Sequence, residues 1–328
     1  MRYEYASVLR QEFNDYVALR AASIKESTHA KIKYILSELD RFLVANGATA
    51  KALTEDILTK WLQSMDVKPI TKRKKVIAVG GLAKYLSLLG IETYIPEIPR
   101  ESHDYVPYIF TADEIARIIA ETDNLAAIQP HNLDPQASAQ MPVLIRLLYG
   151  CGLRLGEALA LHWNDVDFDA STLLIKHSKN DKQRIVPISI SLAEICKMYR
   201  YSGLCGSGET EFLFGNQKGF PYSQSRIREL FNTVLQKAEI EHMRSAKYER
   251  GACLHCLRHL FVLRSFAKVK SEGRSFDDSV PYLSTYLGHD SILETDKYLK
   301  FSYEMYPDAH EAVSVYTNGV FPKVVTAE

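Results

Sequence analysis

Apolar side chains recur every three or four positions through much of the first hundred residues. Between residues 28 and 45 they fall at Ile32, Ile35, Leu36, Leu39, Phe42 and Leu43. This spacing places them on one face of a helix, and Gly47 stands where such a helix would end. Thr54, followed by two acidic residues, begins a second and shorter helix. The pattern predicts a helical bundle in the N-terminal part.

A third helix is predicted to start near Thr71 and to stop at Gly90. The apolar positions that we expect it to bury are Val76, Ile77, Leu82, Tyr85, Leu86 and Leu89. Residues 93–109 then contain three prolines and little apolar period, which indicates an extended linker. The expected divisions of the chain are a helical domain over 1–95, a linker over 96–109 and a second domain over 110–328.

The second part of the chain mixes helical periods with strand-like runs. Thr111 caps a predicted helix, and a strongly apolar helical segment ends near Ala160 after a break at Gly150–Gly152. Three short runs follow, separated by turn-rich segments, at residues 165–168, 172–176 and 184–188. Helical periodicity returns from about Ser223. The predicted fold is mainly α with a small antiparallel β-sheet, in which a mixed α+β domain follows the helical one.

Composition narrows the class of protein. Hydrophobic residues make up 46% of the 328 residues and charged residues 24%, as in globular proteins. No apolar run approaches the roughly 20 residues that a membrane span requires, and the first residues lack a signal pattern. Five cysteines, an odd number scattered along the chain, argue against a secreted disulfide framework. We therefore expect a cytoplasmic protein with no membrane partner.

Net charge alone gives little support for a nucleic-acid partner, since Lys+Arg and Asp+Glu both number 40. The distribution is uneven, however, and one cluster of cations lies before and within the third predicted helix. Its members are Lys68, Lys72, Arg73, Lys74 and Lys75. A solvated helix face would account for them. The positive end of a helix dipole disfavours cations in the first turn. Contacts with DNA phosphates would offset this electrostatic cost, whereas exposure to solvent alone would not.

Several polar residues stand out against apolar surroundings in the second part. They are Arg154 and Glu157 in GLRLGE, His255 and Arg258 in HCLRH, His289 in LGH, and Tyr298 nine positions later. Taken one at a time, each has a structural explanation: an arginine beside a glutamate forms an ion pair, and a histidine or tyrosine at a helix edge packs. Their order and spacing suggest a common site.

In that order and spacing, the residues closely resemble the signature of the tyrosine recombinase (phage integrase) family. The segment HSKNDKQRIVPI also looks like the hairpin that carries this family's catalytic lysine. The resemblance covers about residues 106–305 and implies a helical core-binding domain followed by the mixed catalytic domain. It implies that Tyr298 attacks a DNA phosphodiester and forms a 3′-phosphotyrosyl bond, with no cofactor, ATP or metal.

The residue types suit that chemistry. Guanidinium groups bind phosphate in a planar, bidentate way and stay protonated, which fits Arg154 and Arg258. His255 and His289 can donate to the phosphate or exchange protons near neutral pH. Glu157 is expected to orient an arginine or histidine. For the leaving 5′ oxygen, the resemblance implies Lys179 as proton donor, with Lys176 and Lys182 as alternatives close in sequence.

The family also implies partners. These are double-stranded DNA with specific recombination sites, a homo-tetramer assembled on that DNA, and an accessory directionality factor. Two departures from many family members, Leu260 after the HCLRH run and Lys300 two positions after the tyrosine, touch no core catalytic group. They weaken assignment to the chromosome-dimer-resolving branch, so we expect an integrase or transposon recombinase of a mobile genetic element that performs integration and excision.

Three other interpretations compete with this one. Cys253 and Cys256 could form half of a zinc site or a thiol redox pair, but no second ligand pair has suitable spacing. A catalytically silent DNA-binding regulator could share the fold, although it would have no reason to keep all six catalytic residues. A type IB topoisomerase shares the chemistry, and the two-domain layout and short length disfavour it.

Overall fold

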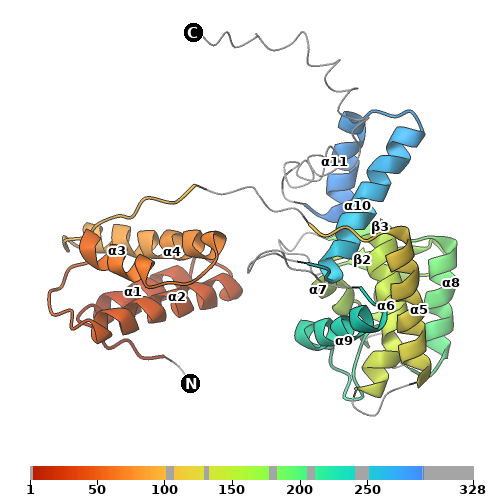
Figure 1. Ribbon diagram of the computed structural model, residues 1–328, viewed down its shortest axis with the longest axis horizontal. Coiled ribbons are helices and arrows are strands. Elements are labelled where there is room, and N and C mark those ends of the chain that lie inside the picture. Colours follow the sequence, from red (N-terminus) through yellow and green to blue (C-terminus); the bar gives the residue numbers. More distant parts are fainter. Residues whose placement is uncertain are drawn as a thin grey trace, which may run out of the picture. The chain divides into compact units, whose positions relative to one another are not determined.

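The computed structural model describes residues 3–100, 107–128, 133–176, 183–204, 211–240, 251–289 and 291. The chain divides into two compact units, one ending at residue 105 and the other starting at 106 (Figure 1). Each unit has a buried apolar cluster of its own. Within the described residues, no helix combines the length and apolar character needed to cross a membrane.

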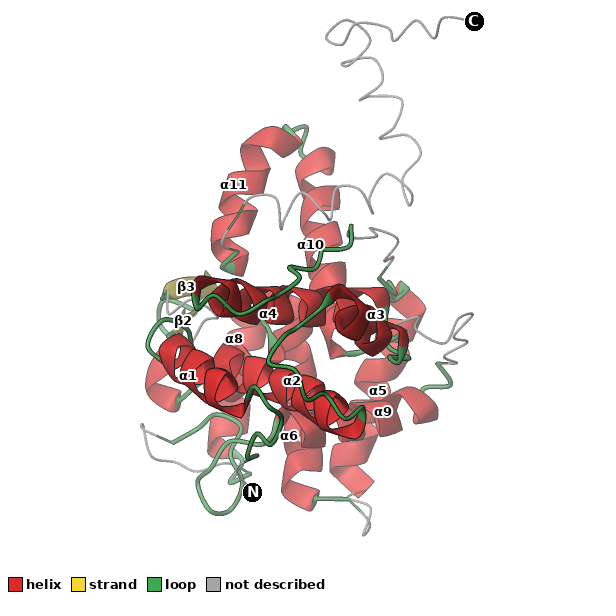
Figure 2. Cartoon of the chain, turned by 90° about the vertical axis from the view of Figure 1, so that its left-hand side faces the viewer, coloured by secondary structure: helices red, strands yellow, loops and turns green. Residues whose placement is uncertain are grey.

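The N-terminal unit is a bundle of four helices (Figure 2). They are α1 (Arg10–Ala21), α2 (Glu26–Ala45), α3 (Glu55–Gln63) and α4 (Pro69–Leu88). Leu36 and Leu39 of α2, Trp61 of α3 and Leu82 of α4 meet in its core, as the sequence period predicts. Thr54 caps α3 by accepting a hydrogen bond from the backbone N–H of Ile57.

Helix α4 departs from the prediction in two respects. It begins at Pro69, two residues earlier than expected, because proline suits the first position of a helix. Most of the basic cluster therefore lies beyond the first turn, where the helix dipole acts weakly. Two of the residues expected in the core, Ile77 and Leu89, are 43% and 52% exposed. Ile77 follows buried Val76 directly, so the two side chains cannot face the same way in a helix.

Two glycines in the middle of α4 offer a test of local stability. A methyl group added at Gly80 would meet nothing within 4 Å, whereas one at Gly81 would meet the Tyr16 hydroxyl. Because glycine in a helix costs about 0.5–1 kcal/mol relative to alanine, Gly80→Ala should raise the free energy of unfolding by about that amount. Gly81→Ala, the matched control, should lose the gain because Tyr16 must move. Urea unfolding of the full chain measures both, and equal gains would contradict the packing described.

The C-terminal unit combines helices with a small sheet (Figure 1). The apolar helix α6 (Pro135–Cys151) packs against α5 (Ala112–Ile128), α8 (Ile190–Tyr201) and α10 (Leu254–Ser271). The remaining helices are α7 (Leu155–Leu159), η1 (Trp163–Asp165), α9 (Gln224–Lys237) and α11 (Phe276–Leu287). Eleven residues of α6 are buried, which explains its near-continuous apolar sequence.

The predicted three-stranded antiparallel sheet is present, in the order β1-β2-β3. Its strands are β1 (Val166–Asp167), β2 (Thr172–Ile175) and β3 (Arg184–Pro187). Leu173 and Ile175 of β2 and Val186 of β3 point into the core, while Ile185 is 65% exposed. Since Arg184 pairs directly with Ile175 across the ladder, its side chain lies on this buried face.

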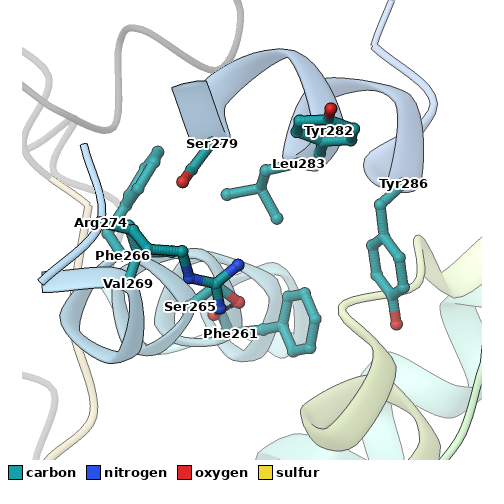
Figure 3. Close-up of a pocket in the computed structure, with 9 residues that line it drawn as sticks. All are labelled: Phe261, Ser265, Phe266, Val269, Arg274, Ser279, Tyr282, Leu283 and Tyr286. Carbon is teal, nitrogen blue, oxygen red and sulfur yellow. Dashed lines mark hydrogen bonds between the residues drawn. The ribbon is translucent and has the colours of Figure 1, made fainter. Parts of the chain in front are cut away.

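Helices α10 and α11 pack through a separate apolar cluster that includes Val262, Phe266 and Leu287. A groove of about 340 Å³ lies between them, with Phe261, Leu283 and Tyr286 among its lining residues (Figure 3). The rings of Phe261 and Tyr286 stack with centroids 5.4 Å apart. This packing fixes the end of α11 against α10, which matters for the site described next.

Candidate active site

Two left-handed glycines terminate helices and place the candidate arginine and histidine. Gly152 ends α6 with φ +60°, after which the chain turns so that Arg154 precedes α7. Gly288 ends α11 with φ +64°. The N–H of Gly288 bonds to Thr285 O and that of His289 to Ser284 O, the two bonds of a Schellman motif. The LGH sequence is therefore a helix-terminating motif that projects His289 at a defined point.

The carboxylate of Glu157 is the centre of the site and is only 3% exposed. Its Oε2 accepts the backbone N–H of Arg154, and its Oε1 accepts Arg154 Nη1 at 2.9 Å. The nearest guanidinium nitrogen of Arg258 lies 4.0 Å away. Burial by itself raises the pKa of Glu157, but its hydrogen bonds and the charges of the arginines outweigh this and lower it. The carboxylate of Glu157 is therefore ionised and binds the guanidinium group of Arg154.

Sequence reasoning missed one member of the site, Arg184. Its Nη1 and Nη2 donate to both oxygens of Glu157 at 3.1 and 2.8 Å, and its Nε donates to Tyr286 O at 2.7 Å. The available signal was strand alternation. Arg184 stands two positions before buried Val186, on the face of β3 where an apolar residue is expected. A cation at such a position requires an anionic partner in the interior.

Arg258, from the second turn of α10, is almost fully buried, with 1% of its surface exposed. Its Nη1 donates to Gly152 O at 2.8 Å and its Nη2 to Leu287 O at 2.8 Å. Nη2 also lies 3.0 Å from Nε2 of His289. Because a guanidinium can only donate, Nε2 of His289 accepts this hydrogen bond and carries no proton.

The carboxyl end of α11 collects all three guanidinium groups. Tyr286 O accepts from Arg184, Leu287 O from Arg258, and Gly288 O from Arg154 at 3.2 and 3.3 Å. These carbonyls form the negative end of the helix dipole, where cations are stabilised. The structure thus brings Arg154, Glu157, Arg258 and His289 together, which the sequence analysis proposed as parts of one site.

His255 lies in the first turn of α10 and is exposed, unlike Arg258 one turn later. Its ring meets that of His259 edge to face, with centroids 4.6 Å apart. Its imidazole is thus exposed at the beginning of the helix that carries Arg258.

Comparison with known proteins decides the family. The profile of the phage integrase family matches residues 109–305, more than half of the chain. The chain belongs to the phage integrase family. The tyrosine recombinase XerC of Bacillus subtilis is 26% identical to it over 295 residues, covering 85% of this chain and 88% of XerC. A candidate integrase/recombinase of Sinorhizobium fredii, y4rB, is 26% identical over 316 residues, covering 92% of this chain and 96% of y4rB.

The fold of this integrase agrees with solved structures. The XerH site-specific recombinase bound to difH substrate, in a pre-cleavage complex, superposes with a TM-score of 0.67 at 18% identity. The superposition covers 96% of this chain and all of that one. The family and its relatives identify the integrase as an enzyme of site-specific DNA recombination, and DNA as its substrate.

Three lysines are candidates from the sequence for the group that protonates the leaving 5′ oxygen. Lys176, just after β2, lies 2.5 Å from Asp165 Oδ1. Since Lys176 follows buried Ile175, it lies on the face of the strand opposite Arg184. This placement turns Lys176 away from Glu157 and leaves Lys179 and Lys182 as candidates. Both lie outside the described residues, as does Tyr298.

Tyr286 also contributes to the site, because its backbone carbonyl accepts a hydrogen bond from Arg184. Its hydroxyl is a poor candidate for a nucleophile, because burial raises the pKa of Tyr286 despite the nearby charges of Arg184 and Arg258. The phenolate form of Tyr286, which would be needed for attack on a phosphate, is therefore disfavoured. Tyr298 stays the nucleophile predicted from the sequence.

The basic cluster of the N-terminal unit is not uniform. Lys75 is buried and its ammonium pairs with Glu38 at 2.8 Å. Arg73 donates from Nε to Pro99 O at 3.0 Å, while Lys74 is exposed. Lys68 and Lys72 are half-buried. Lys75 therefore has a structural role in the bundle, and the other four cations remain candidates for phosphate contacts.

The paired cysteines of the integrase flank the start of α10. Cys253 is the residue before the helix, and its Sγ lies 3.5 Å from Sγ of Cys256. Across the described part of the chain, no three His, Cys, Asp or Glu side chains are grouped as a metal site would require. The two sulfurs therefore have each other as neighbours, and no described ligand completes the zinc site considered from the sequence.

Burial and the neighbouring arginines Arg258, Arg154 and Arg184 lower the pKa of His289 to about 3. Because this is below the pKa of about 6.5 in the unfolded chain, protonation favours unfolding as the pH falls from 6.5. His289 is half-buried, so solvent screening reduces the effect, and we expect a loss of about 1 kcal/mol between pH 7 and pH 5. Urea unfolding of wild type and His289→Asn at both pH values isolates this contribution. An equal loss in both proteins would contradict it.

Proposed function

We propose that this recombinase cleaves one DNA strand by attack of the Tyr298 hydroxyl on a phosphodiester bound by Arg154 and Arg258. The reaction leaves a 3′-phosphotyrosyl bond and a free 5′ hydroxyl, which then attacks the partner strand. The observation that carries the proposal is the cluster of three guanidinium groups and His289 around the carboxylate of Glu157.

The charge of the cluster suits a phosphodiester. Among the described residues of the site, three arginines against one ionised carboxylate leave an excess of positive charge in partly buried surroundings, where electrostatic interactions are strong. A phosphodiester brings one negative charge, and its transition state develops more on the nonbridging oxygens. Arginines held in place before the reaction stabilise that charge without reorganisation. Arg154, whose side chain is 25% exposed, is open to such a ligand.

The two histidines complete the assignment. His289 is neutral and accepts a hydrogen bond from Arg258. The negative charge of a bound phosphate would raise its pKa and allow it to exchange a proton near neutral pH. His255 is assigned to a nonbridging phosphate oxygen from its exposed position. Lys179 is proposed to donate a proton to the leaving 5′ oxygen. The ion pair of Lys176 with Asp165 supports this choice over Lys176.

The N-terminal domain, residues 1–95, is proposed to bind the DNA duplex as a core-binding domain, joined by the linker over 96–109 to the catalytic domain over 110–328. Lys68, Lys72, Arg73 and Lys74 are its proposed phosphate contacts. A tetramer on two specific recombination sites is proposed as the active assembly, and a lambda integrase of similar fold has been solved as a tetramer bound to a Holliday junction. An accessory directionality factor would select integration or excision of a mobile element.

Covalent trapping on nicked suicide DNA tests the proposal. The DNA should come from the ends of the element that encodes the protein, and the reaction should contain EDTA and no ATP. We expect an adduct that survives denaturing electrophoresis. The released strand should accept phosphate from polynucleotide kinase, because cleavage leaves a 5′ hydroxyl.

Other outcomes separate the alternatives. Specific retention of the DNA without any adduct would favour the silent regulator. Relaxation of plasmid that lacks a recombination site would favour topoisomerase activity. An adduct that forms only with a divalent metal would contradict the proposed chemistry, in which arginines supply the positive charge.

A further inference from the structure

We propose that Arg184 is a positioning residue for strand cleavage. It neutralises Glu157 and fixes the end of α11, so that Arg154, Arg258 and His289 stay directed to the scissile phosphate. This inference rests on the proposed function and assigns a role to a residue that was not among the candidates taken from the sequence.

The bonding of Arg184 is directed inward at every nitrogen. Nη1 and Nη2 bind the two oxygens of Glu157, and Nε binds Tyr286 O. The side chain is 9% exposed, against 25% for Arg154. The guanidinium group of Arg184 thus binds a carboxylate and a carbonyl of the protein. It would act on the reaction indirectly, through the residues that these two groups position.

The role follows from competition for Glu157. A buried carboxylate attracts every neighbouring cation, and Arg154 already donates to Oε1 while Arg258 lies 4.0 Å from Oε2. The bidentate pair with Arg184 satisfies both oxygens with one guanidinium. Without Arg184, the full negative charge of Glu157 would act on Arg154 and Arg258 and weaken their attraction to phosphate.

Arg184 also holds the segment that carries His289. A Cβ added at Gly288 would lie 2.8 Å from Nη1 and 3.1 Å from Cζ of Arg184, so the guanidinium lies directly against this glycine. The glycine is thus required twice, for its left-handed φ and for this close packing. Through Gly288 and Tyr286 O, the first residue of β3 is tied to the turn from which His289 projects.

A charge-compensation experiment separates this role from simple structural support. The rate of covalent adduct formation is measured in single turnover on suicide DNA for wild type, Arg184→Met, Glu157→Gln and the double variant. Arg184→Met should slow cleavage by about 100-fold, the order expected for a displacement of about 1 Å in a site. The double variant should recover at least about fivefold relative to Arg184→Met, because the charge that Arg184 neutralises is gone.

Two further variants control the experiment. Arg146→Met breaks a comparable bidentate pair with Asp123, at 2.8 and 2.7 Å, in the same unit but outside the site. It should leave the rate within about twofold. Arg184→Lys keeps the charge but cannot bind both oxygens and Tyr286 O together, so it should fall between wild type and Arg184→Met. DNA retention and thermal unfolding confirm that each variant is folded.

The outcomes are distinguishable. A double variant whose loss equals the product of the two single losses would overturn the role of Arg184, as would a rate for Arg184→Met within twofold of wild type. If Arg184→Met does not fold, the comparison of Arg184→Gln with Arg184→Gln combined with Glu157→Gln decides by the same criterion, because glutamine also removes the positive charge. Absence of adduct in wild type would instead overturn the proposed function itself.

Discussion

Replacing Tyr298 with phenylalanine is expected to abolish the covalent protein–DNA adduct while leaving DNA binding intact. The substitution removes only the hydroxyl oxygen that would form the phosphotyrosyl bond, so no slower version of the same step remains. Wild type and Tyr298→Phe should be compared on the same nicked suicide DNA, with adducts counted on denaturing gels and binding measured by native retention.

Two other tyrosines serve as matched controls for Tyr298→Phe. Tyr303→Phe changes a tyrosine five positions away, and Tyr286→Phe changes one whose backbone carbonyl accepts from Arg184. Both variants should still form the adduct. An adduct that persists in Tyr298→Phe and disappears in either control would move the nucleophile to that residue.

Arg258→Gln is expected to show the second largest effect, a loss of roughly 10²- to 10³-fold in the rate of adduct formation. The basis is the cost of removing one prearranged donor that stabilises developing oxyanion charge. The substitution also removes the 2.8 Å hydrogen bonds that Arg258 donates to Gly152 O and Leu287 O in a buried place. Single-turnover cleavage at saturating protein measures the catalytic loss, and urea unfolding measures the accompanying loss of stability.

The variant Arg258→Lys separates the charge of Arg258 from its hydrogen-bonding geometry. Arg258→Lys preserves the charge but has one nitrogen in place of two guanidinium nitrogens that reach Gly152 O, Leu287 O and His289. It should recover less than a tenth of the wild-type rate. Full activity of Arg258→Lys would show that charge alone is sufficient and that the geometry described here is not needed.

The sequence predicts much of the fold because its local signals agree with the final packing. The strand runs at 172–176 and 184–188 lie between turn residues and alternate correctly, and both appear as strands with the expected antiparallel pairing. Helix ends at Gly47 and Gly90 coincide with positive φ angles that glycine adopts easily. At Ile77 the prediction of burial was wrong, because this position follows Val76 directly and its side chain is 43% exposed.

The candidate site was only partly predictable. Four charged or polar residues of the signature could be placed in one site because their order matches a known family. Arg184 was overlooked because its importance depends on Glu157 and Tyr286 O, which come from segments 27 and 102 residues away. No local pattern encodes such pairings, although the cation on the buried face of β3 was a clue that something must neutralise it.

The collection of arginines at the end of α11 has a consequence for biosynthesis. Arg154 bonds to Gly288 across 134 positions of sequence, and Arg258 bonds to Gly152 across 106. Contacts of such long range form late in folding, and domains fold during synthesis from the N-terminal side. A ribosome-bound chain therefore cannot assemble this cluster of arginines until α11 has emerged. If the cluster binds the scissile phosphate, as proposed, a nascent polypeptide that lacks α11 has no site for strand cleavage.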